Sequence, residues 1–331
     1  MTRGDIGIQI GASTSAAELG AIAAEAERLG YCEIWLAEDY FELGGIASVA
    51  SALAATDQIP VGLGVVAAPV RHPAVLAMEF ATLSEAFPHR FMAGIGHGSP
   101  GWVRQMGLAP RSPLGLLREA TESTRQLLAG AELTEEGEYF QFDQVHLDRP
   151  PGEPTPIYLG VHGPASLRLS GELVEGTLLG WFSSPGYVAW ARERIAEGRD
   201  RSDRSGHHQL VALCVISISD VDASAARRDL GRWVAPMLSS MAGSPQVTAS
   251  ARSRELLELL GQGDEQVLID GITDGLLSEF VAAGDSESCA ATIERLLEAG
   301  ADRVVVVPNP AGYRTTSSMV EQMKTAAKLL S

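Results

Sequence analysis

Two adjacent carboxylates, Glu38 and Asp39, are followed directly by two aromatic residues that begin with Tyr40. Paired carboxylates in a partly desolvated pocket can separate their pKa values, so that one stays protonated near neutral pH and serves as a general acid. Glu38, Asp39 and Tyr40 are therefore the candidate catalytic residues. The alternative is structural: one of the carboxylates holds a loop amide or the guanidinium group of Arg71.

Glycine-rich segments at 62–69, 94–99 and 160–166 are candidates for a ligand site. Glycine within a strand often marks a bulge or a close approach of a ligand, although tight packing against a neighbouring strand explains the same residues. In the third segment Pro164 suits the first turn of a helix, and the free amides of a helix N-terminus bind anions. This segment is therefore a candidate for holding a phosphate group.

The elements that position these residues repeat along the chain. Apolar runs typical of strands begin at residues 6, 33, 61 and 91, with helical segments between them. The runs are continuously apolar, which is typical of parallel strands that are buried on both faces. Further runs at 157–161, 177–179, 210–217 and 303–307 bring the predicted number of strands to eight.

Eight βα units predict an α/β fold of the TIM (β/α)8 barrel type, in which active sites lie at the carboxyl ends of the strands. We expect an excursion hairpin near 133–147 and a mainly helical insertion over the barrel mouth near 222–284. We expect residues 1–331 to form a single domain of this type. Asp39, Gly64, His97 and Gly163 should then all lie near the mouth.

The composition argues against several classes of function. There are 42 acidic and 25 basic residues, which gives a net charge of −17, so we expect no nucleic-acid partner. The sequence has no run of about 20 apolar residues, so we expect no membrane span. The first residues carry no apolar signal region, so we expect a cytoplasmic location. The three cysteines lack metal-ligand spacing, so we expect neither a metal site nor a disulfide framework.

Taken together, these segments resemble the luciferase-like family of flavin- and deazaflavin-dependent oxidoreductases, especially the branch similar to coenzyme F420-dependent methylenetetrahydromethanopterin reductases. The resemblance covers nearly the whole chain and rests on the order and spacing of five strings. They are EIWLAEDY at 33–40, GLGVV at 62–66, PVRHPA at 69–74, GIGHG at 94–98 and PIYLGVHGP at 156–164.

The resemblance implies an enzyme that transfers a hydride between the deazaflavin ring of F420 and a small organic substrate, and it implies a homodimer. It also implies a bulge at Gly64 and Val65, often a non-prolyl cis peptide, behind the cofactor ring. The positions that it assigns to cofactor contacts are Gly64, Val65, His97, Gly98, Gly160, Val161, His162 and Gly163.

The chain departs from the family pattern at two places. The reductases typically have Asp-His-Tyr where this chain has Glu38, Asp39 and Tyr40, and the sugar-phosphate dehydrogenases of the family carry a glutamate where this chain has Ser99. The substrate of neither group can therefore be transferred. Two alternatives remain: an FMN-dependent luciferase-like monooxygenase that uses molecular oxygen, and a flavin-binding protein without turnover.

Overall fold

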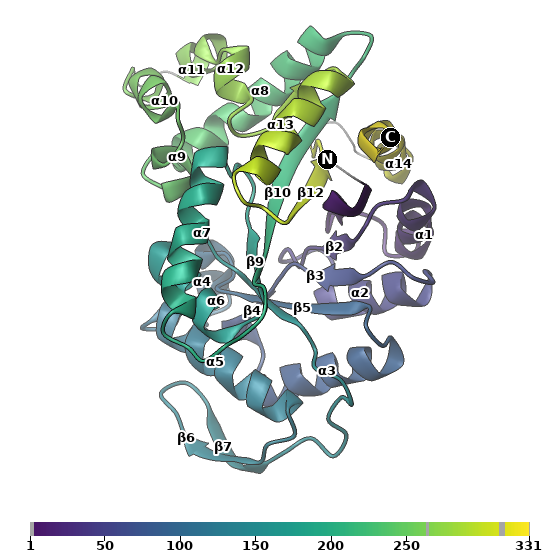
Figure 1. Cartoon of the computed structure of the whole chain (residues 1–331), viewed down its shortest axis with the longest axis vertical. Helices are drawn as coiled ribbons and strands as arrows, with labels where there is room; N and C mark the ends of the chain where they lie inside the picture. The colour runs from purple at the N-terminus through teal and green to yellow at the C-terminus, as the bar shows by residue number, and fades with distance from the viewer. Residues whose placement is uncertain (1–2, 263–264, 311–314, 331) are drawn as a thin grey trace.

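A computed structural model describes residues 3–262, 265–310 and 315–330 of the chain. Eight parallel strands close into a barrel, in the order β1-β2-β3-β5-β8-β9-β10-β12 and back to β1 (Figure 1). Their bounds are β1 Ile6–Ile10, β2 Ile34–Leu36, β3 Val61–Leu63, β5 Phe91–Gly96, β8 Ile157–Gly160, β9 Gly176–Leu179, β10 Gln209–Ile218 and β12 Arg303–Pro308. The predicted TIM barrel is confirmed.

Helices follow the strands and cover the outside of the barrel (Figure 1). They are α1 Leu19–Leu29, α2 Gly45–Ala54, α3 Pro73–Ala86, α5 Pro113–Leu128, α6 Pro164–Leu173, α7 Pro185–Arg199, α13 Ser286–Glu298 and α14 Thr316–Ala326. Four of them begin with proline, whose fixed φ suits the first helical position and whose missing N–H is not needed there. Short 3-10 turns lie at Arg3–Asp5, Ala68–Val70 and Ala327–Leu330.

Alternate residues of the strands face two separate cores, as the twofold period of a strand requires. Ile6 and Ile8 of β1 pack outward in one cluster with helix residues such as Ile22. Trp35 of β2 and Tyr158 of β8 meet in the barrel interior, where their ring centroids lie 5.2 Å apart in an edge-to-face contact. Strands buried on both sides explain why their sequences are continuously apolar.

Both predicted interruptions of the barrel are confirmed. The hairpin consists of β6 (Leu133–Glu136) and β7 (Gln141–Val145), which pair antiparallel. The insertion contains α8 (Ala223–Ser240), α9 (Pro245–Thr248), α10 (Ser253–Leu260), α11 (Glu265–Gly271), α12 (Asp274–Leu277) and a short strand that was not expected, β11 (Ala282–Gly284), which extends the sheet beside β10. The insertion and the hairpin lie at opposite ends of the long axis (Figure 1).

The insertion continues the barrel core. Leu230 and Val234 of α8 belong to the same buried cluster as Val215 and Val307 near the carboxyl ends of β10 and β12. Helix α8 therefore covers this part of the mouth with an apolar face. Among the described residues, no helix combines the length and the apolar character that a membrane span requires.

Candidate active site

The residues singled out in the sequence follow different strands but lie at one end of the barrel. Asp39 follows β2, and Gly64 lies between β3 and the short strand β4 (Val66–Ala67). His97 follows β5, and Gly163 follows β8 as the N-cap residue of α6. Because the strands of a closed parallel barrel share one direction, these residues all lie at its carboxyl-terminal mouth.

The carboxylate of Glu38 is fully engaged by the protein. Arg71 donates two hydrogen bonds to it, of 2.7 and 2.8 Å, and the Tyr40 hydroxyl and the Gly45 amide each donate one of 2.8 Å. Burial tends to raise the pKa of Glu38, but the bonds from Arg71, Gly45 and Tyr40 outweigh burial and hold this pKa below its ordinary value. Glu38 is therefore ionised near neutral pH, and it ties the end of β2 to α2.

Asp39 has the opposite environment. Its side chain is half-buried and forms no hydrogen bond or ion pair with any described residue. Burial and the nearby charge of Glu42 raise its pKa. A free carboxyl group with a raised pKa at the mouth of a TIM barrel has the properties that a general acid needs. The structure thus separates the two carboxylates, one held by the protein and one free.

An aromatic cluster surrounds Tyr40. Its ring lies 6.0 Å, centroid to centroid, from that of Phe41 and 6.0 Å from that of Trp102 on α4 (Pro100–Gln105). Burial and the hydrogen bond to Glu38 raise the pKa of Tyr40 to about 12, so its hydroxyl stays protonated. Phe41 is 69% exposed. Sequence reasoning missed Trp102, because only the tertiary structure brings α4 next to the end of β2.

The peptide bond between Gly64 and Val65 is cis, as is that between Tyr40 and Phe41. The Val65 side chain fills space left by glycines on two neighbouring strands. A Cβ atom at Gly96 would lie 2.6 Å, and one at Gly160 2.7 Å, from a Val65 methyl group. A Cβ atom at Gly64 would crowd Leu178 instead. Packing against the chain's own side chains therefore accounts for these glycines.

His97 joins two of the loops at the mouth. Its Nε2 lies 2.8 Å from the Ser166 hydroxyl in the first turn of α6, and its Nδ1 is buried. Burial, with a smaller effect from His162, lowers the pKa of His97, so the ring is neutral near pH 7. Both ring nitrogens are thus directed into the protein. Ser166 is a residue whose role the sequence did not indicate.

The loop before α6 leaves room at the helix N-terminus. A Cβ atom at Gly163 would meet nothing within 4 Å, and no side chain caps the helix. Val161 is buried, and the carbonyl of His162 accepts a hydrogen bond of 2.9 Å from Tyr187. Gly98 has a φ of 72°, a conformation that favours glycine. The start of α6 therefore offers backbone amides to an anion without a competing side chain.

Other chemistry finds little support in the described part of the chain. It contains no group of three or more histidine, cysteine or acidic side chains that could hold a metal ion. Cys32, Cys214 and Cys289 are free thiols, and burial is the main cause that raises the pKa of each. Such thiols are poor nucleophiles.

The closed barrel, with a free carboxyl group and an open helix N-terminus at its mouth, defines a TIM-barrel protein whose candidate active site lies at the usual end of the fold. The sequence model of the luciferase-like monooxygenase family matches residues 1–303. The chain belongs to this family.

Individual relatives are similar over most of their length. The 5,10-methylenetetrahydromethanopterin reductase of Methanolobus tindarius is 27% identical over 306 residues, which cover 90% of this chain and 92% of the relative. The F420-dependent glucose-6-phosphate dehydrogenase of Nakamurella multipartita is 28% identical over 232 residues, or 66% of this chain and 68% of the relative. The coenzyme F420-dependent tetrahydromethanopterin reductase of Methanopyrus kandleri has the same fold, with a TM-score of 0.78, 23% identity and 98% of each chain covered.

Proposed function

We propose that this chain is an F420-dependent oxidoreductase that transfers a hydride between the deazaflavin ring and a small organic substrate with an unsaturated carbon–carbon or carbon–nitrogen bond. Relatives that are named as F420-dependent support the cofactor assignment. The observation that carries the proposal in this chain is the free, half-buried Asp39 at the barrel mouth, whose pKa is raised. Hydride transfer to an unsaturated bond requires a proton as well, and Asp39 can donate it.

The residues that would hold the cofactor are those the family resemblance singles out. Gly64 and Val65 would support one face of the ring, and the backbone around Gly98 and from Gly160 to Gly163 would line its edge. The amides at the start of α6 fit a phosphate group, because the site has room and no capping side chain. Coenzyme F420 supplies the hydride chemistry when it is bound.

The other residues of the site would then position Asp39. Glu38 is anchored by Arg71 and by the first amide of α2, so it fixes the backbone from which Asp39 extends. Tyr40 stays protonated and is held by Glu38. Helix α8 of the insertion covers part of the mouth with apolar residues and would exclude water there. Asp39 is therefore our proposed proton donor, and Glu38 and Tyr40 are positioning residues.

An FMN-dependent monooxygenase is the second candidate, because the family is named for monooxygenase activity. The third is a flavin-binding protein without turnover. Fluorescence titration of the purified protein with F420, FMN and their reduced forms should show preferential binding of F420. Turnover should continue in oxygen-free buffer, because hydride transfer needs no oxygen. Preferential FMN binding with oxygen-dependent turnover would establish the monooxygenase, and binding without any turnover would establish the third candidate.

We propose further that residues 1–331 form one domain, that the chain forms a homodimer like that implied by the family resemblance, and that it acts in the cytoplasm without a nucleic-acid partner. Size-exclusion chromatography with light scattering tests the dimer directly. A monomer at micromolar concentration would contradict it.

A further inference from the structure

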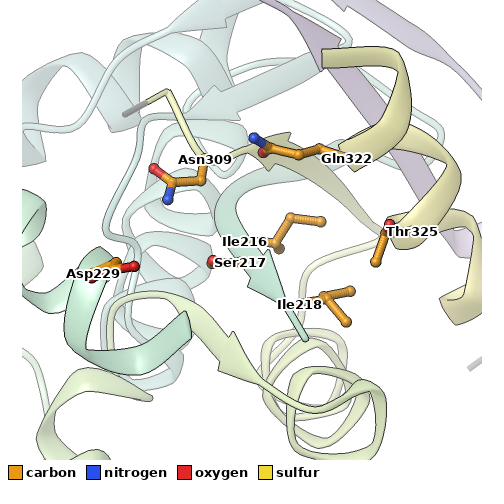
Figure 2. Close-up of a pocket in the computed structure, with 7 residues that line it drawn as sticks. All are labelled: Ile216, Ser217, Ile218, Asp229, Asn309, Gln322 and Thr325. Atoms are coloured by element: carbon orange, nitrogen blue, oxygen red, sulfur yellow. The ribbon is translucent and has the colours of Figure 1, made fainter. Parts of the chain in front are cut away.

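A cavity of about 370 Å³ with a mixed polar and apolar lining lies at the carboxyl ends of β10 and β12, and none of its lining residues is assigned to the candidate active site. It is lined by residues 216–218 at the end of β10, by Asp229 of α8, by Asn309 and by Gln322 and Thr325 of α14. Figure 2 shows Asp229 and Thr325 on opposite sides of the end of β10. Small-molecule sites commonly have volumes of about 300–1,000 Å³.

The electrostatics of the cavity favour a positive charge. Asp229 is the one charged residue among the described residues of the lining. Its side chain is 68% exposed and has a single ion pair with the described residues, at 3.5 Å, with the exposed Arg232. Thr325 lies in the last turn of α14, where the helix carries a partial negative charge. The described residues of the lining include no lysine or arginine to attract an anion, and the whole chain has a net charge of −17.

Hydrogen-bonding groups in the cavity remain available. The side chains of Ser217 and Gln322 form no hydrogen bond with any residue in the described ranges. The Thr325 hydroxyl donates to the carbonyl oxygen of Glu321 at 2.9 Å, so its own oxygen can still accept. Three neutral acceptors and one carboxylate can therefore serve a ligand that donates several hydrogen bonds.

The lining also has an apolar part. Ile216 and Ile218 are on the same side of β10 and contribute aliphatic side chains to the cavity (Figure 2). A ligand that satisfies both parts carries a compact cationic donor group at one end and a short hydrocarbon chain at the other. An ammonium group offers three donors and a full positive charge.

We propose that this cavity is a second small-molecule site, separate from the hydride-transfer site, and that it binds a primary alkylammonium ion. The ammonium group is held by Asp229 with Gln322 and Ser217, and the alkyl chain lies against Ile216 and Ile218. The proposal does not depend on the identity of the redox cofactor.

The test uses n-butylammonium chloride as the probe in isothermal titration calorimetry of the full chain at constant ionic strength. Saturable one-site binding is expected, with little or no binding of 1-butanol or butyrate. Asp229→Asn keeps the shape of the side chain but removes its charge, so it should weaken binding by about tenfold or more, because charge-assisted hydrogen bonds are the strong ones. Gln322→Ala should weaken it by a smaller factor.

Asp143→Asn is the matched control, because Asp143 is an exposed aspartate on β7, in the hairpin. The affinity of the Asp143→Asn variant for n-butylammonium should equal that of the unmodified chain. The proposal is overturned if butylammonium does not bind saturably, if butyrate binds as well, or if Asp143→Asn weakens binding as much as Asp229→Asn. Should Asp229→Asn fail to fold, an unchanged affinity in Gln322→Ala would overturn it equally.

Discussion

The side chain of Val65 occupies the space that the missing side chain of Gly160 leaves free. A Cβ atom at Gly160 would lie 2.7 Å from one methyl group of Val65 and 3.0 Å from the other, closer than carbon atoms pack. Gly160 ends β8, whereas Val65 lies between β3 and β4, so the contact crosses β5. The wall of the candidate cofactor site is thus built by interlocking side chains of different strands.

This contact predicts the effect of adding a single methyl group. Gly160→Ala should reduce the free energy of unfolding by about 1–3 kcal/mol, because overpacking forces neighbouring atoms to move. Adding Val65→Ala to that variant should recover part of the loss. Urea denaturation measures both effects. Gly163→Ala is the matched control, since its Cβ would meet nothing within 4 Å. Equal losses at Gly160 and Gly163 would show that the contact with Val65 is unimportant.

Asp39→Asn should reduce turnover by about 100- to 10,000-fold while leaving cofactor affinity and stability nearly unchanged, because it removes only the transferable proton. Steady-state kinetics and fluorescence titration measure the two effects. Asp143→Asn controls for the loss of one surface charge. Near-normal turnover in Asp39→Asn would exclude Asp39 as the proton donor.

The effect of the Glu42 charge on Asp39 leads to a prediction about how turnover depends on pH. A general acid must be protonated, so turnover should fall as the pH rises through the pKa of Asp39. Glu42 helps to raise that pKa, so Glu42→Gln should move this fall to lower pH. A pH–rate profile that keeps its position in Glu42→Gln would argue that another group supplies the proton.

Glu38→Gln should destabilise the protein by about 3 kcal/mol, because it removes the charge of a buried carboxylate that pairs with Arg71 and leaves the partly buried guanidinium with only its longer contact to Glu79. The loss in the double variant Glu38→Gln with Arg71→Gln should be smaller than the sum of the single losses. Since the folded protein lowers the pKa of Glu38, its contribution is complete above the ordinary value of 4.5 and is lost as the pH falls below it. Additive single losses would mean that the pair does not act as a unit.

The environment of His208 leads to a second prediction about pH, which concerns the free energy of unfolding and not the activity. It is buried, it shares a 2.8 Å hydrogen bond with Thr177, and burial lowers its pKa to about 3. The unfolded chain binds a proton near pH 6.5 and the folded chain does not, so its contribution is complete above that pH. Below pH 6.5 the free energy of unfolding should therefore fall by about 1.4 kcal/mol for each pH unit. His208→Gln should remove this part of the pH dependence of unfolding, and an unchanged dependence would contradict the assignment.

The sequence by itself determined the order of the elements. The strand runs beginning near residues 6, 33, 61 and 91, the hairpin near 133–147 and the insertion near 222–284 all appear in the structure. Each depends on local information: hydrophobic periodicity, turn residues and the distance between repeats. Parallel strands buried on both faces also produce a distinctive apolar pattern. The barrel, and the end of it where chemistry occurs, could therefore be predicted.

Only the tertiary structure decided what each site residue does. Glu38 and Asp39 are neighbours with the same functional group, and they differ because Arg71, 33 residues away, reaches one and not the other. His97 contacts Ser166, 69 residues further along the chain, and Tyr40 contacts Trp102 of α4. Such contacts form when the barrel closes, and no periodicity in the chain encodes which side chains then face each other. The pKa of a carboxyl group depends on these neighbours and its burial, so its role is decided by the folded structure.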